Sequence, residues 1–147
     1  MKHVDIFITH NMTGMKAGRA AYAYVISAGT SKGEATYTGF GVHQDATVNR
    51  INLTALKSAL EHFHSPAEIT VYTDSSTIAG AFNCGNLKAW ENNGFQTAKK
   101  KPLANADLWR RIAELVRRHL VNVILTRRHQ YTDWAERELE RKYGKPQ

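Results

Sequence analysis

The chain has 147 residues, of which 42% are hydrophobic and 22% are charged. These proportions are ordinary for a globular protein, and the length suffices for a domain with a substantial core. We therefore expect a single domain over residues 1–147. The net charge of +7, from 20 Lys and Arg against 13 Asp and Glu, favours polyanionic partners, of which nucleic acid is the simplest.

The single cysteine, Cys84, excludes an internal disulfide and a cysteine-based zinc site. This composition fits a reducing compartment. The N-terminal stretch MKHVDIFITH lacks the long apolar core of a signal peptide, and no apolar run is long enough to cross a bilayer. We expect a cytoplasmic protein without a membrane partner.

The N-terminal part of the chain is predicted to form three antiparallel strands. Its first run is mostly apolar, and the second places Tyr22, Tyr24 and Ile26 on one face with the period of a strand. The predicted strands are Val4–Thr9, Ala20–Ser27 and Glu34–Val42, joined by a loop at His10–Gly18 and a hairpin turn at Gly29–Gly33.

The central part alternates helix and strand. Ile51–His62 has the period of a helix, and Ile69–Thr73 is a β-branched strand that stops at Asp74. Ser75 or Ser76 is expected to cap the next helix, with Asp74 as the alternative cap. The apolar face of the first helix is formed by Ile51, Leu53, Leu56, Ala59, Leu60 and Phe63.

The C-terminal part begins with a short helix and a basic segment that Pro102 ends. The helix that follows is expected to bury Leu108, Trp109, Ile112, Leu115 and Val116, with Arg110, Arg111, Arg117 and Arg118 on its outer side. Asp133 and Glu136 are spaced for a capping arrangement. The predicted segments are Asn86–Gly94, Phe95–Lys101, Asn105–Leu120, the strand Asn122–Thr126, the loop Arg127–Thr132 and the helix Asp133–Lys142.

This order of elements predicts an α/β fold. Three antiparallel strands are followed by strand–helix–strand steps, which require right-handed crossovers and parallel additions to the sheet. We expect a mixed sheet with helices on both faces.

Four stretches of the sequence resemble type 1 ribonuclease H. They are VDIFIT at 4–9, TVNRINL at 47–53, VYTDSS at 71–76 and GFQTAKKKPLANADLW at 94–109. The last resembles the basic protrusion of the bacterial enzymes and the helix after it. The resemblance extends from Val4 to Tyr143 and implies an RNase H-like fold with a mixed five-stranded sheet.

The resemblance also implies where the active site lies. Enzymes of the family use four acidic side chains to hold two magnesium ions, and the ions promote cleavage of a phosphodiester bond. Carried over one position at a time, these acids correspond to Thr9, Asn52, Asp74 and Arg137, so that Asp74 is the only retained acid. We expect Asp74 and Arg137 to form an ion pair. His129 matches a loop histidine of the family and is a candidate proton carrier, whereas His10 is expected to be a solvated loop residue.

A site of this composition is poor in negative charge. Magnesium prefers charged oxygen ligands, and Thr9 and Asn52 supply only neutral ones. No metal is therefore expected, or at most one at Asp74, and Mg²⁺ or Mn²⁺ would be needed only if the protein is catalytic. Asp133 or Glu140 would have to rebuild the site in that case.

The residues that bind nucleic acid in the family are better preserved in this sequence than the metal-binding acids. Thr47 and Asn49 correspond to contacts with the nucleic-acid backbone, and Ser76 replaces a longer polar side chain. Lysines and aromatic residues in the protrusion suit phosphates and sugars. The candidates implied there are Lys88, Trp90, Phe95, Lys99, Lys100, Lys101 and Asn105.

Three functions follow as hypotheses. The first is an RNase H-like domain that binds RNA/DNA hybrid, or double-stranded RNA or DNA, with little or no nuclease activity. The second is an active metal-dependent endoribonuclease with a rearranged site. The third is a non-catalytic scaffold whose arginines at 110, 111, 117 and 118 face an acidic protein partner.

Overall fold

A computed structural model describes residues 1–14 and 16–145. Its centre is a five-stranded sheet in the order β3-β2-β1-β4-β5. The strands are β1 (Lys2–His10), β2 (Gly18–Thr30), β3 (Gly33–Ala46), β4 (Ala67–Thr73) and β5 (Leu120–Leu125). The helices are α1 (Val48–Leu60), α2 (Ser76–Asn83), α3 (Asn86–Asn92), α4 (Ala106–Val116) and α5 (Thr132–Tyr143).

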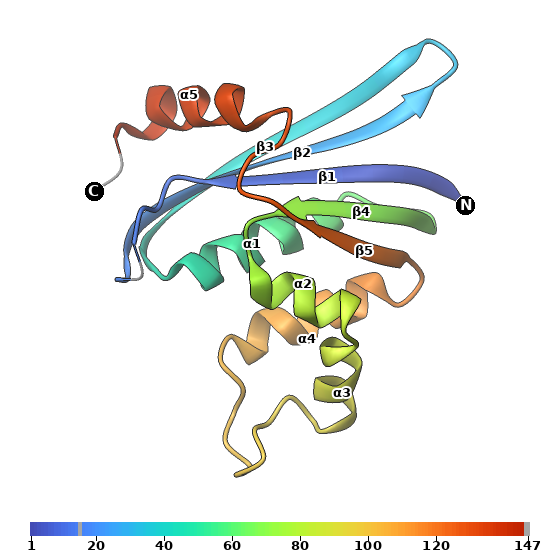
Figure 1. Cartoon of the computed structure of the whole chain (residues 1–147), viewed down its shortest axis with the longest axis vertical. Helices are drawn as coiled ribbons and strands as arrows, with labels where there is room; N and C mark the ends of the chain where they lie inside the picture. The colour runs from blue at the N-terminus through green and yellow to red at the C-terminus, as the bar shows by residue number, and fades with distance from the viewer. Residues whose placement is uncertain (15, 146–147) are drawn as a thin grey trace.

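The sheet is mixed, as the order of elements predicts. β2 pairs antiparallel with both β1 and β3, whereas β4 runs parallel to β1 and to β5. Figure 1 shows α5 on one face of the sheet and the other four helices on the opposite face. The predicted RNase H-like architecture, three antiparallel strands with parallel additions and helices on both faces, is confirmed.

The main core lies between the sheet and α1, α2 and α4. The predicted inner face of α1 is buried, with Ile51, Leu56 and Ala59 each 0% exposed. Trp109 and Ile112 of α4 are buried in the same cluster, which explains why α4 can form a second helical layer. A second, smaller cluster fixes α5 through Ala135 and Leu139 against Ala21 and Ala23 of β2.

Side-chain packing explains why glycine occupies two positions of β3. The rings of Tyr24 and Tyr22 lie where a Cβ at Gly39 and Gly41 would be, so that any side chain there would collide with a ring. The tyrosines are held from the other side, because the Tyr22 hydroxyl lies 3.3 Å from the Ser58 hydroxyl and the Tyr24 hydroxyl 2.7 Å from His62 Nε2. The two glycines thus leave room for the tyrosine rings, and β3 continues past them to Ala46.

Several predicted boundaries differ from the structure. The predicted helix Asn105–Leu120 is too long, because α4 ends at Val116 and β5 already begins at Leu120, which pairs with Glu68. The chain turns between them at His119, whose Nδ1 accepts a hydrogen bond from the Ala67 N–H at 3.1 Å. In the described residues no helix is both long and apolar enough to cross a bilayer.

Removal of the Leu139 side chain is expected to release α5. Leu139 is 0% exposed, so Leu139→Ala leaves a cavity in the small cluster and should cost about 2–5 kcal/mol of unfolding free energy. Urea unfolding measures this loss. The control is Leu120→Ala on β5, where the leucine is 61% exposed and the expected loss is under about 0.5 kcal/mol. Equal losses in the two variants would contradict the packing of α5.

Candidate functional site

A polar pocket of about 160 Å³ opens at one edge of the sheet. β1 and β4 run parallel, so their carboxyl ends meet there, and Thr9 from β1 and Asp74 after β4 both line the pocket. The loop after β5 and the first turns of α5 form the opposite wall. The lining residues are Ile8, Thr9, His10, Met12, Asp74, Thr126, Arg127, Arg128, Thr132 and Glu136.

Asp74 is held by two donors. His10 Nε2 lies 2.8 Å from Asp74 Oδ2, and the Asn52 amide donates to Oδ1 at 3.3 Å. The hydrogen bond from His10 lowers the pKa of Asp74, and this effect outweighs burial, which acts in the opposite direction. Because His10 Nδ1 also accepts the Met12 N–H at 3.1 Å, its ring is fixed with the Nε2 proton toward Asp74. The expectation of a solvated His10 is wrong, since its side chain is only 11% exposed.

Asn52 lies beneath Asp74 on α1 and is 1% exposed. Its amide nitrogen faces Asp74, whereas its Oδ1 is buried without a hydrogen-bond partner in the described part of the chain. A buried carbonyl-type oxygen without a partner costs free energy. Among the described residues, this oxygen is a buried acceptor next to the site that no donor uses.

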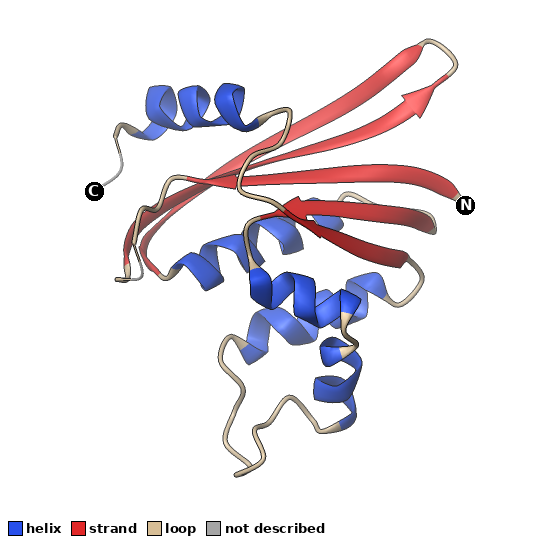
Figure 2. Ribbon diagram, viewed as in Figure 1, coloured by secondary structure: helices blue, strands red, loops and turns tan. Residues whose placement is uncertain are grey.

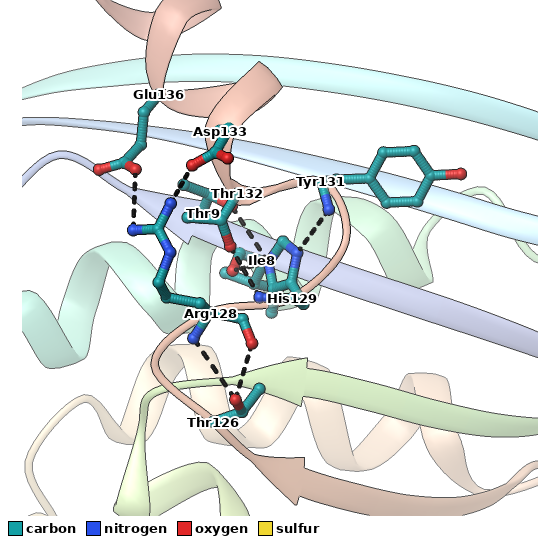
Figure 3. A network of polar contacts seen from close by, with 9 residues as sticks. All are labelled: Ile8, Thr9, Thr126, Arg128, His129, Tyr131, Thr132, Asp133 and Glu136. Atoms are coloured by element: carbon teal, nitrogen blue, oxygen red, sulfur yellow. Dashed lines mark hydrogen bonds and ion pairs between the residues drawn. The ribbon is translucent and has the colours of Figure 1, made fainter.

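His129 anchors the loop after β5 to the end of β1. Its Nε2 donates to the Ile8 carbonyl at 2.9 Å and lies 3.2 Å from Thr9 Oγ1, and its Nδ1 accepts the Tyr131 N–H at 3.2 Å (Figure 3). Burial lowers the pKa of His129 and favours this neutral ring. Both ring nitrogens are occupied, so the geometry supports a role in holding the loop rather than in carrying protons.

Arg128 brings a positive charge to the other side of the pocket. Its guanidinium pairs with Asp133 and, at 3.4 Å, with Glu136, as Figure 3 shows. The predicted capping arrangement of Asp133 and Glu136 is wrong, because no side chain caps the start of α5 and both acids face Arg128. Glu136 thus shares the pocket with Asp74 but has its own counter-ion.

Arg137 does not line this pocket, and the predicted ion pair between Asp74 and Arg137 is wrong. Ala135 and Leu139 are the buried positions of α5, while Arg137 is exposed. Glu136 follows Thr132 by four residues, so the two lie on one side of the helix and reach the pocket together. Neither Asp133 nor Glu140 lines it, so Glu136 is the second carboxylate of the site.

The predicted nucleic-acid contacts lie on α1, α2, α3 and the loop between α3 and α4. That loop projects away from the sheet in Figure 2 and is closed by a Gln96–Pro102 bridge and a 2.7 Å bond from Thr97 N to Lys101 O. We call residues 94–105 the basic loop. Exposed side chains among the candidates are those of Thr47, Asn49, Ser76, Lys88, Lys99, Lys100 and Lys101.

Three of the candidates have contacts inside the protein that leave their side chains less open to a ligand. Phe95 was expected among the contacts to phosphates and sugars, but it is 6% exposed and its ring lies under Arg110 at 5.1 Å, so it packs inside the protein. Asn105 accepts a hydrogen bond from Arg50 at 3.1 Å, which ties the end of the basic loop to α1. Trp90 is half-buried and packs on Trp109, with ring centres 5.1 Å apart.

The contact of His10 with Asp74 predicts a measurable pKa change. We expect His10→Ala to raise the pKa of Asp74, because the strongest influence that lowers it is lost. In the native protein this contact stabilises the fold above the unfolded carboxyl pKa of about 3.9, and the contribution is lost as pH falls through the lower folded pKa. Carboxyl ¹³C NMR during a pH titration measures the change. His43→Ala, an exposed histidine of β3, should leave the Asp74 titration as it is.

Comparison with known proteins identifies the family of the chain. The sequence matches the RNase H family over residues 9–136. A Ribonuclease H of Chlorobium phaeobacteroides is 35% identical over 136 residues, covering 92% of this chain and 90% of the relative. The chain belongs to the RNase H family. Within the part of this RNase H chain that the structure describes, no three His, Cys, Asp or Glu side chains are grouped to hold a metal ion.

Solved RNase H structures share the fold at low sequence identity. LC9-RNase H1, a type 1 RNase H with the type 2 active-site motif, has a TM-score of 0.74 and 17% identity, over 93% of this chain and 70% of that one. LC11-RNase H1, solved with an RNA/DNA hybrid, has a TM-score of 0.60 and 18% identity, over 92% and 94%.

Proposed function

We propose that this RNase H-family protein binds RNA/DNA hybrid or related duplexes and has little or no nuclease activity. The observation that carries the proposal is the charge of the pocket. Its two carboxylates, Asp74 and Glu136, already have internal partners in His10 and Arg128.

The electrostatics work against a pair of divalent ions. The family resemblance assigns metal-binding acids to the positions of Thr9 and Asn52, which offer only neutral oxygens. The Arg128 guanidinium beside Glu136 repels a metal ion, and two unit charges at about 4 Å interact by about 4 kcal/mol at an effective dielectric of about 20. These residues therefore do not fit a site for two metal ions.

Nucleic-acid binding depends on different groups. The structure of LC11-RNase H1 contains an RNA/DNA hybrid, and this chain shares its fold. The net charge of +7 and the exposed Lys99, Lys100 and Lys101 of the basic loop supply contacts for phosphates. The arginines of α4 and of the turn after it, at 110, 111, 117 and 118, are weaker candidates for contact with a protein partner. Each already has an acceptor within the chain, either a backbone carbonyl or a carboxylate.

A second candidate is a metal-dependent endoribonuclease with a rearranged site. The unused Oδ1 of Asn52 favours it, since amide oxygens ligate Mg²⁺ and the same side chain contacts Asp74 through its amide nitrogen. Glu136 would then have to leave Arg128 to complete the site.

Hybrid binding and cleavage assays distinguish these functions. We expect hybrid binding in EDTA, little cleavage with Mg²⁺ or Mn²⁺, and a melting temperature that millimolar Mg²⁺ does not change. Asp74→Asn is the matched variant, because it removes the charge at constant size. Robust cutting by the native chain that Asp74→Asn abolishes would establish the endoribonuclease instead, and absence of binding to any duplex would favour the scaffold.

A further inference from the structure

A second cavity lies far from the polar pocket, on the helical side of the sheet. It has a volume of about 340 Å³ and is formed by α2, α3, α4 and the start of β5. We call it the helical groove. Its apolar wall consists of Phe82, Leu87, Ala113, Val116 and Val121. This volume lies at the lower end of the range for small-molecule sites, which combine an apolar surface with a few polar groups.

One buried polar side chain in the groove has an unused hydrogen-bonding group. His119 lines the groove, is 8% exposed, and uses Nδ1 to accept the Ala67 N–H at 3.1 Å. This acceptor role places the ring proton on Nε2, which has no protein partner among the described residues. Burial and the nearby Arg118 lower the pKa of His119, so the ring is neutral near neutral pH and offers one N–H donor.

The charged side chains at the edge of the groove indicate which charge a ligand should carry. Lys88, Glu91 and Arg117 line it, and Arg117 pairs with Glu91 at 3.2 Å. The pair leaves Lys88 as one excess positive charge. A donor inside and a cation at the edge both favour an anionic acceptor such as a carboxylate.

From these features we propose that the helical groove is a binding site for a small aryl or alkyl carboxylate. The apolar tail packs on Leu87, Val116 and Val121, and the carboxylate accepts from His119 Nε2 and lies near Lys88. The site shares Lys88 with the predicted nucleic-acid contacts but lies apart from the polar pocket and does not include Lys99, Lys100 or Lys101, so either proposal can fail alone.

The test uses 4-phenylbutyrate as the probe and its neutral amide as the matched control. In ¹H–¹⁵N NMR titrations of the full chain, we expect saturable shifts confined to residues around the groove. The carboxylate should bind about five-fold or more tightly than the amide, because only it gains the charge-assisted bond and the attraction of Lys88. Equal affinities of the two probes, or no saturation at millimolar concentrations, would overturn the proposal.

Variants on α4 locate the binding site. Val116→Phe fills the groove and should abolish the shifts, whereas Leu115→Phe on the same helix does not face the groove and should preserve them. Thermal melts of both variants establish that they are folded. If Val116→Phe is folded and still binds 4-phenylbutyrate as the native chain does, the ligand lies elsewhere and the proposal is wrong. His119→Phe should reduce the preference for the carboxylate over the amide.

Discussion

Replacement of two neutral side chains by acids, Thr9→Asp with Asn52→Glu, is expected to raise Mg²⁺-dependent cleavage of RNA/DNA hybrid by about 10³-fold. Thr9, Asp74 and Glu136 line one pocket and the Asn52 amide contacts Asp74, so the double variant brings four carboxylates close together. Metal ions in such a site contribute several kcal/mol to the transition state, and each 1.36 kcal/mol is worth about tenfold in rate. Single-turnover cleavage of a labelled hybrid measures the gain.

The neutral double variant Thr9→Asn with Asn52→Gln controls for shape. It introduces side chains of the same size without charge and should leave cleavage at the native level. Adding Arg128→Ala to the acidic pair should increase the rate further, because Glu136 loses its guanidinium partner. A native chain that cuts as fast as the acidic variant would show that the missing charge is not what limits the reaction.

The fold was predictable because local patterns and tertiary packing agree in this chain. The apolar face of α1 follows the helical period that its sequence shows. Ser75, one of the two serines expected to cap α2, does so, with its hydroxyl accepting the Ile78 N–H at 3.1 Å. The alternative of an Asp74 cap is wrong. Asp74 is thus left for the pocket, where a carboxylate at the end of a buried strand was expected.

The details of the site were less predictable, for two physical reasons. The contact between His10 and Asp74 joins residues 64 positions apart, and no local pattern reports such a contact. The error at Arg137 was one of register along α5: Arg137 is exposed, whereas Glu136 lies one helical turn after Thr132 and lines the pocket with it. Counting four residues from Thr132, the start of α5, would have identified Glu136.

Charge removal from the basic loop should weaken hybrid binding strongly. We expect Lys99→Gln, Lys100→Gln and Lys101→Gln together to reduce affinity by about 100-fold at about 0.1 M salt, because each lysine that contacts a phosphate releases a counter-ion. The slope of log affinity against log salt should become shallower by about 0.9 for each such lysine. Fluorescence anisotropy at several salt concentrations measures both quantities.

A triple variant at the C-terminal end of α4 and in the turn after it, called the α4 variant, removes the same charge from a different surface. Arg111, Arg117 and Arg118 are exposed, but they pair with Glu114, Glu91 and the Phe63 carbonyl. Changing all three to Gln should therefore leave hybrid affinity and its salt dependence close to native, after melts show that the variant is folded. If the α4 variant loses hybrid affinity and the lysine variant does not, the nucleic acid binds along α4. A loss of equal size in both would show that net charge alone, rather than the basic loop, drives binding.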